Sequence, residues 1–521
     1  MRLPISLSSA TALGLPVIVL IVGGGCGARS TLLEGETLSP TGGTGGVASG
    51  GNGAGGGQTA TTSVTSSTSG STSATGGGSP TTTSTGQPVA TCPTFSFVKT
   101  LGGSGRQRVH QVELDSQGNS FVRGAYQTKL NLGSQIETPS ESWSWFLAKL
   151  NSNLTPEWVH VVDGCDHFEA FGGPPPRFHV NGQGQPMAGV RVAVGQTCDF
   201  GTGPIESTVG HSDYLIMFDS VGAPLFQRDV PGWLGFLIPW ETDGFRFSVT
   251  HWGNPITFDW FTPPSNSSAF AAQLDSWGNL TWASSLDSML MGGGYVKPSR
   301  AFAEGDGMYL EGDYYGAVEI GDVEVPPTTC TYYSNQGNCQ TWEPETFGAH
   351  AGIEGAISGV EVPARWLTPT PNGGLLAALP TVENDYSLDD IAYFAADKTL
   401  VYKTSFLPED QWNGVGFGVI DRLMDLTGQV WVVAYADADI EVGGQKVEAG
   451  TFWVILDASG EISCVGDFGG SGWRPSLRLA PNGEVWFTGT IKGPVIINGE
   501  QFSPPDQFEE LLFLKSGPTS I

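Results

Sequence analysis

Basic residues are scarce in this chain. Its 521 residues include 23 lysines and arginines against 52 aspartates and glutamates, which gives a formal net charge of -29 at pH 7. An acidic surface of this size repels polyanions, so nucleic acids and anionic membrane surfaces are not expected as partners. A solvated acidic face is the simplest explanation of the charge, ahead of an acidic binding patch.

Motifs that carry common enzyme chemistry are missing as well. The seven histidines form no HExxH or HxH arrangement, and there is no GxSxG elbow, P-loop or dinucleotide fingerprint. No CxxC or paired His/Cys spacing supports a zinc site. A glycosidase needs only two carboxylates at the right separation, but 52 acidic residues single out no pair. We therefore predict no catalytic residue.

Short apolar runs separated by Asp/Gly turns are abundant. The clearest unit spans residues 425–470, where β-branched and aromatic runs alternate with turns and predict four consecutive antiparallel strands. Its first turn recurs, with its glycine at positions 118, 184, 244, 307, 373, 428 and 483. A later turn, residues 457–460 in this unit, also recurs seven times, with the fourth copy placed at Ser358 and Gly359. The chain thus contains seven copies.

Four short strands repeated seven times predict an all-β fold, a seven-bladed β-propeller of four-stranded antiparallel blades. The seventh copy ends near Gly517 without its fourth strand. A matching segment, residues 95–103, precedes the first copy and ends like the exit of the sixth at residues 468–470. The N-terminal strand is therefore predicted to complete the last blade and close the ring.

The repeats also resemble a known family. The similarity is carried in the first copy by Gly118, Asn119, Phe121, Val122, Gly124, residues 146–151 and Trp158, together with Gly102 and Gly103. These residues resemble the SBBP-type β-propeller repeats of secreted bacterial proteins, and the resemblance covers about residues 95–517. It implies a propeller and a secreted context, and it brings no catalytic motif.

Residues 1–25 are expected to form a secretory signal, because the apolar run 13–22 is short and interrupted by Gly14 and Pro16. The segment Gly23-Gly24-Gly25-Cys26 resembles a lipobox, which implies lipidation of Cys26. The alternative is ordinary cleavage nearby with Cys26 left free. Residues 26–90 are rich in Gly, Ser and Thr and predict a disordered tether with a mean span of about 45 Å. Residues 91–521 would then form the propeller.

Six cysteines remain besides Cys26, an even number that fits an oxidising compartment. Cys330 and Cys339 are close enough to close a small loop, and we predict a disulfide between them. Cys165 with Cys198, and Cys92 with Cys464, are suggested for the others, whose connectivity the sequence alone does not determine.

Acidic residues precede comparable strands in several copies. Propeller symmetry would gather Asp213, Asp389, Asp390 and Glu509 at one rim of the central channel, where carboxylates suit Ca²⁺. The competing interpretation is that each caps its own turn through a local hydrogen bond. No EF-hand or nonapeptide spacing supports the calcium site.

Aromatic residues outside the predicted strands are the other candidates for ligand contact. They are Trp233, Trp240, Trp252, Trp260, Phe261, Tyr332, Tyr333 and Trp342. Exposed rings suit a sugar face or a protein hot spot, whereas rings folded over blade ends would be structural. The insertion at about residues 325–353 combines the predicted disulfide with three of these rings and is the best candidate for a recognition loop.

Together these features predict an exported, monomeric propeller, lipid-anchored to the bacterial cell envelope at the outer membrane or cell surface, or else secreted. It would act as a binding or scaffolding module for a polysaccharide or protein. An exported glycan hydrolase or lyase with acidic residues at the channel mouth is the alternative, and a Ca²⁺-stabilised scaffold is another. Fold alone does not decide among them.

Overall fold

The chain divides into Met1–Glu34, in which no residue is described, and Gly35–Ile521, which holds every described residue. The computed structural model describes residues 92–102, 107–133, 143–163, 165, 177–207, 212–240, 244–251, 256–304, 307–321, 323–333, 339–342, 345–352, 357–361, 367–380, 388–406, 415–469, 472–504 and 510–516. Cys26 and the tether lie outside these ranges. Within them, no helix is long and apolar enough to span a membrane.

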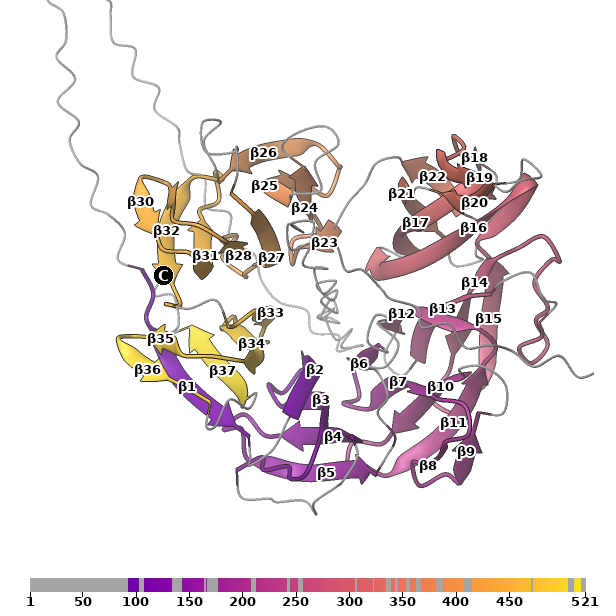
Figure 1. Cartoon of the computed structure of the whole chain (residues 1–521), viewed down its shortest axis with the longest axis horizontal. Coiled ribbons are helices and arrows are strands. Elements are labelled where there is room, and N and C mark those ends of the chain that lie inside the picture. The colour runs from indigo at the N-terminus through magenta and orange to yellow at the C-terminus, as the bar shows by residue number, and fades with distance from the viewer. Residues whose placement is uncertain are drawn as a thin grey trace, which may run out of the picture. The chain divides into compact units, whose positions relative to one another are not determined.

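Seven antiparallel sheets with four main strands each stand around a common centre and form a seven-bladed propeller (Figure 1). Blades 1 to 3 comprise β2 (Gln107–Leu114), β3 (Ser120–Tyr126), β4 (Ser144–Leu150) and β5 (Pro156–Val162); β6 (Phe178–Val180), β7 (Pro186–Val192), β10 (Ser212–Phe218) and β11 (Pro224–Val230); and β12 (Trp233–Trp240), β13 (Gly244–Thr250), β14 (Ala269–Leu274) and β15 (Leu280–Ser285). Blades 4 and 5 comprise β16 (Asp287–Glu304), β17 (Gly307–Ile320), β21 (Glu345–Ala351) and β22 (Ile357–Glu361); and β23 (Leu367–Pro369), β24 (Leu375–Pro380), β25 (Leu388–Phe394) and β26 (Leu400–Ser405).

Blade 6 comprises β27 (Phe417–Met424), β28 (Val430–Ala436), β31 (Gly450–Leu456) and β32 (Ile462–Asp467). Blade 7 comprises β33 (Ser476–Leu479), β34 (Val485–Ile491), β37 (Glu510–Ser516) and β1 (Phe95–Leu101). In each blade the first strand lies innermost and the fourth outermost (Figure 1). The predicted fold is confirmed.

Ring closure by the N-terminal strand is also confirmed. β1 pairs antiparallel with β37, with Val98 opposite Leu514 and Leu101 opposite Leu511. In Figure 1 the indigo β1 lies beside the yellow β37, so the two ends of the described chain share one sheet. Joining early and late segments in one blade closes the ring through backbone pairing.

Most of the recurring turns fold as the sequence pattern indicates, whereas Gly244 and Gly307, expected in turns, begin β13 and β17. In the turn from Asp425, Oδ1 accepts hydrogen bonds from the backbone N–H groups of Thr427 and Gln429, at 2.8 and 3.0 Å. The glycine at the fourth position has a positive φ, +86° at Gly428, which glycine adopts without strain. The same pair of bonds recurs from Asp115, Asn151, Asn181, Asp219, Asp275 and Asp457. These side chains therefore hold the turns that link neighbouring strands.

The apolar core lies between the blades. Seven clusters of buried side chains are present among the described residues, and each joins two neighbouring blades. The cluster between blades 4 and 5 is the smallest, with Phe302, Tyr309, Leu367, Ala377 and Ala392. Because the neighbouring blades cover both faces of each sheet, strands such as β31 are buried at every position.

Small hairpins between the second and third strands fill the outer edges of several blades. They are β8 (Thr197–Asp199) with β9 (Pro204–Glu206), β29 (Ile440–Val442) with β30 (Gln445–Val447), and β35 (Val495–Ile497) with β36 (Glu500–Phe502). Blade 4 instead carries β18 (Val323–Glu324), which pairs with β17, and the hairpin of β19 (Cys330–Tyr333) and β20 (Cys339–Trp342). The recognition insertion predicted in blade 4 is thus partly a β-hairpin.

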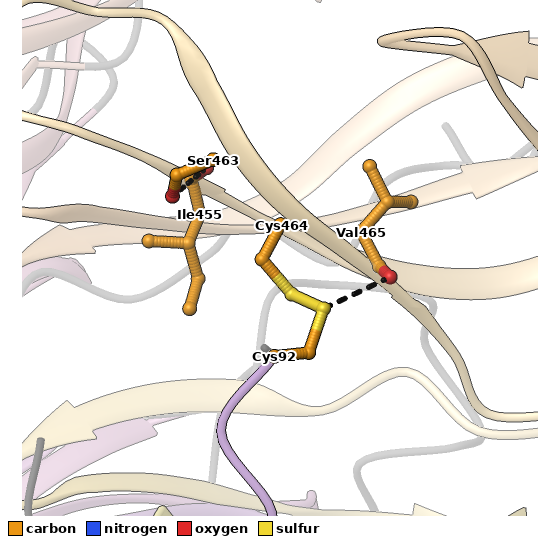
Figure 2. Close-up of a disulfide and its surroundings, with 5 residues drawn as sticks. All are labelled: Cys92, Ile455, Ser463, Cys464 and Val465. Atoms are coloured by element: carbon orange, nitrogen blue, oxygen red, sulfur yellow. Dashed lines mark hydrogen bonds between the residues drawn. A yellow bond between two sulfur atoms is a disulfide. The ribbon is translucent and has the colours of Figure 1, made fainter. Parts of the chain in front are cut away.

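Two of the suggested disulfides are confirmed, and both join neighbouring blades. Cys165 follows the outer strand of blade 1 and pairs with Cys198 in the hairpin of blade 2. Cys92 precedes β1 and pairs with Cys464 in β32, joining blade 7 to blade 6 (Figure 2). Cys330 is also disulfide-bonded. The side chain of Cys339 lies outside the described residues, so the pairing of Cys330 with Cys339 stays a prediction.

Two expectations about local structure are wrong. Trp233 and Trp240 begin and end β12 instead of lying in loops, and Trp240 is buried against the guanidinium of Arg246. Cation–π contact and burial explain these rings without a ligand. Ser358 and Gly359, expected in a turn, lie within β22.

Candidate functional site

The inner strands bring buried ionisable side chains of four blades together. Arg478 on β33 donates a hydrogen bond from Nε to the backbone oxygen of Val112, at 2.7 Å. Its Nη2 lies 3.5 Å from Oε1 of Glu113 on β2, and its Nη1 lies 3.9 Å from Oδ2 of Asp421 on β27. His179 on β6 approaches the same Glu113 oxygen to 3.7 Å. One guanidinium thus connects carboxylates from blades 1 and 6.

Several buried polar side chains near the centre also bind the backbone of the next blade. Asp421 accepts a hydrogen bond from the N–H of Leu477 at 2.7 Å, and Glu311 accepts one from Leu367 N at 2.7 Å. Gln111 both donates to the oxygen of Phe178 and accepts from its N–H. A short first strand leaves one edge without a ladder partner, and side chains from the preceding blade satisfy part of that edge. This cluster therefore has a structural role between blades.

Burial shifts the acid–base properties of these groups. Burial raises the pKa of Glu113, although Arg478 opposes the shift, and burial raises the pKa of Asp421 in the same way. Burial raises the pKa of Glu311 to about 7 and lowers that of His179 to about 3. The first and second strands of the blades therefore hold carboxyl groups that retain protons more readily than usual, beside a neutral imidazole. Such groups suit proton transfer as well as structural pairing.

The predicted calcium ligands are not brought into one described cluster. Asp213 on β10 is bound by Arg191 through both oxygens, at 2.7 and 2.9 Å, and Oδ2 also accepts from Leu234 N. Asp390 on β25 is buried and paired with Lys403 at 2.6 Å. The side chain of Asp389 and all of Glu509 lie outside the described residues. Among the residues that are described, no group of three His, Cys, Asp or Glu side chains is arranged to hold a metal ion.

Of the predicted aromatic ligands, Trp260 is the one whose exposed ring the structure describes. Trp260 lies between Phe258 and Phe261, whose backbones pair across a tight turn, and it is 63% exposed. Its Nε1 donates to the oxygen of Leu280 at 3.1 Å, which fixes the indole against the start of β15. Phe261 packs behind it against Phe270, with ring centroids 5.5 Å apart, and therefore belongs to the blade core.

The remaining aromatic predictions fall partly outside the described structure. Trp252 lies outside the described residues. Tyr332 and Tyr333 are on β19 and Trp342 is on β20, and only their backbone is described. Tyr332 is opposite Thr341 and Trp342 is opposite Cys330 in the hairpin register. These rings stay predicted ligand contacts.

Sequence reasoning missed a second exposed indole. Trp277 is 80% exposed and lies in the turn of residues 275–279, only three residues from Leu280, which holds Trp260. The turn uses only the backbone N–H of Trp277, which donates to Asp275 Oδ1 at 2.9 Å. The corresponding position holds Asn153, Val221 or Ser459 in other copies. Comparing this turn position across copies would have revealed a tryptophan that the turn does not require.

No protein-family model matches the chain, and no curated protein matches it. Solved structures with a similar fold include the β-propeller domain of the Trilobed protease from Pyrococcus furiosus, described as having an open velcro topology. It is 8% identical, with a TM-score of 0.40 over 78% of this chain and 93% of that one. A Synechocystis apocarotenoid oxygenase mutant is 11% identical, with a TM-score of 0.34 over 72% and 93%.

A luciferin-regenerating enzyme is 9% identical, with a TM-score of 0.33 over 66% of this chain and 91% of that one. With TM-scores of 0.33 to 0.40, these likenesses carry no argument about this chain, and its propeller architecture rests on its own strand order.

Proposed function

We propose that the chain is a propeller of the SBBP-like secreted type that binds a polysaccharide through the tryptophan edge of blade 3. We define this edge as Trp260 and Trp277. The observation that carries the proposal is the exposure of both indoles around Leu280, 63% and 80%. Flat aromatic rings pack on the apolar faces of sugars while the hydroxyl groups stay in water.

A polysaccharide suits this edge better than a protein partner. Protein hot spots lie in well-packed apolar patches from which water is excluded. Trp277 projects from a polar turn between Asp275 and Asn279, and Asp259 beside Trp260 is ion-paired with Arg228. Because the chain carries a net charge of -29, a neutral glycan fits better than an acidic one.

Export and anchoring belong to the same proposal. Disulfides persist in oxidising compartments, so the bonds Cys92–Cys464 and Cys165–Cys198 support export. Lipidation of Cys26 and a tether over residues 26–90 would hold a monomeric propeller away from the envelope surface. Metabolic labelling with a fatty acid, compared between the natural chain and Cys26→Ser, tests the anchor directly.

Binding to insoluble and soluble neutral polysaccharides tests the ligand. We expect Trp277→Ala and Trp260→Ala each to weaken binding about tenfold, since a lost stacking contact costs roughly 1 to 2 kcal/mol. Leu400 and Val401 on β26 are also exposed, so the variant Leu400→Ala/Val401→Ala is the matched control and should bind normally. Polysaccharide binding that is unchanged in both tryptophan variants would refute the site. If the chain binds a protein and no polysaccharide, the ligand is a protein instead.

The exported glycan-active enzyme is the second candidate. Glu113 and Asp421, both with raised pKa values, lie on either side of Arg478, which favours acid–base chemistry. Release of soluble sugar by the natural chain, and its loss in Glu113→Gln without a fall in glycan binding, would establish this activity. If no soluble product is released from any glycan that binds, the binding function stands and the enzyme is excluded.

A further inference from the structure

Arg422 on β27 is buried and incompletely satisfied. It is 2% exposed, and neither Nε nor Nη2 donates a hydrogen bond to any described residue. An unpaired buried donor loses its bonds to water without replacement, and the penalty is larger for a charged group than for a neutral one. A guanidinium in this condition points to a partner other than the described residues.

The charges around Arg422 do not supply that partner. Glu311 on β17 and Asp421 attract it, but each carboxylate is engaged by backbone N–H groups, of Leu367 for Glu311 and of Leu477 and Arg422 itself for Asp421. A second buried guanidinium, Arg300 on β16, repels Arg422. Burial and this repulsion lower the pKa of Arg422 to about 9, so the group still carries its charge at neutral pH. Two like charges thus lie near each other at a buried place.

We propose that Arg300 and Arg422 bind a small oxyanion, a carboxylate or phosphate group, at the inner edge of blade 5. The two residues come from the inner strands of blades 4 and 6, which flank the three-residue first strand β23. A guanidinium presents a planar fork of donors that matches the two oxygens of a carboxylate or phosphate. An anion there relieves the repulsion between the arginines and satisfies the donors of Arg422.

Water alone explains the arrangement less well. A water molecule can accept a hydrogen bond from Nε or Nη2, but it carries no charge to oppose the repulsion between Arg300 and Arg422. The acidic exterior repels polyanions, so the ligand is a small anion or a single acidic group of an otherwise neutral molecule. This site is separate from the tryptophan edge of blade 3 and does not depend on it.

Anion titration of the full chain tests the proposal. The protein is dialysed into chloride buffer, and phosphate, sulfate or acetate replaces chloride at constant ionic strength while Tm and heats of binding are followed. We expect a saturable Tm increase of a few degrees with at least one of them, because ligands that bind only the folded state stabilise it. A Tm increase with phosphate but not acetate identifies a phosphate group as the ligand, and the reverse identifies a carboxylate.

Variants locate the site. Arg422→Gln should abolish the Tm increase, and Arg422→Lys should reduce it while keeping the charge. Glu311→Gln removes a competing negative charge but keeps an acceptor for Leu367 N, so it should tighten anion binding severalfold. Arg228→Gln removes a partly exposed, ion-paired arginine and is the matched control. The proposal is overturned if the Tm of the natural chain does not respond to any of the three anions, or if Arg422→Gln keeps the full Tm increase. If Arg422→Gln fails to fold, weaker anion binding by Glu311→Gln overturns the proposal instead.

Discussion

The indole of Trp158 on blade 1 lies directly against Gly222 on blade 2. A methyl group on Gly222 would lie 2.7 Å from Cδ2 of that ring, and the glycine also has a φ of +87°. Phe226 and Gly278 repeat this contact between blades 2 and 3, and Tyr402 and Gly460 repeat it between blades 5 and 6. In these three pairs an aromatic residue on the outer strand thus packs on the last turn of the next blade.

The disulfide of Cys464 replaces this contact where the ring closes. Cys464 is opposite Ile455 in the same register that places Trp158 opposite Lys149 and Tyr402 opposite Tyr393. Blade 7 has no continuous turn at this place, since its third strand ends at Ser516 and its fourth begins at Phe95. A covalent bond to Cys92 therefore joins blade 6 to the strand that completes blade 7 (Figure 2).

Substitution of Gly460 by alanine should destabilise the propeller by about 2 to 4 kcal/mol. Its methyl would lie 2.4 Å from Cδ2 of Tyr402, and the residue needs a left-handed backbone with a φ of +86°. Gly428 has the same φ, and an alanine methyl there would meet no described atom within 4 Å, so Gly428→Ala should cost only about 1 kcal/mol. Equal losses in chemical denaturation would contradict the ring contact.

Removal of the closing disulfide should cost more stability than removal of the other. Cys92–Cys464 spans 372 residues and Cys165–Cys198 spans 33, so chain entropy predicts a difference of about 2 kcal/mol. The double variants Cys92→Ala/Cys464→Ala and Cys165→Ala/Cys198→Ala are compared by urea unfolding. The reverse order would show that blade 7 is held mainly by the pairing of β1 with β37.

Glu311 should make stability depend on pH. Its pKa rises from 4.5 to about 7 on folding, so the folded state holds the proton more tightly, and stability is lost as pH rises through this window. The stability of Glu311→Gln relative to the natural chain should therefore increase between pH 5 and pH 7.5, by up to roughly 3 kcal/mol. Urea unfolding in chloride buffer at both pH values measures this difference, and a constant difference would exclude Glu311 as the titrating group.

Asp213 should be essential to stability whether or not calcium is present. Asp213→Asn breaks the two-point pair with Arg191 and should cost about 3 kcal/mol. Asp259→Asn breaks the more exposed pair with Arg228 and should cost less than about 1 kcal/mol. If Tm falls in chelator and recovers in Ca²⁺, and Asp213→Asn removes that response, the predicted calcium site is supported; equal loss in both buffers supports the ion pair alone.

The order of strands and the turns could be predicted because they depend on neighbouring residues. Asp425 needs only the N–H groups two and four residues ahead, and Gly428 supplies the positive φ, so most copies show their turn in a few letters. The missing last strand could be matched to residues 95–103 by the same pattern. The Cys92–Cys464 pair was one suggestion among several, because cysteine spacing does not encode distance across a ring.

The candidate sites depend on contacts that no local pattern records. Trp277 looks like any aromatic residue in the sequence, and its exposure depends on how the folded turn of residues 275–279 places its ring. Arg478 and Glu113 are 365 residues apart, yet ring closure brings their inner strands together. Arg422 and Arg300 likewise come from different blades.

By itself, the sequence determined the repeat number, the four-stranded unit, the local Asx turns and the strand that closes the ring, because each arises from hydrogen bonding or apolar periodicity over a few residues. Only the tertiary structure decided which rings stay in solvent and which carboxylates bind the next blade. It also decided that Arg422 has donors whose hydrogen bonds no described residue accepts. Those properties depend on desolvation and charge among side chains from separate blades, and the ring brings these together only after every blade has formed.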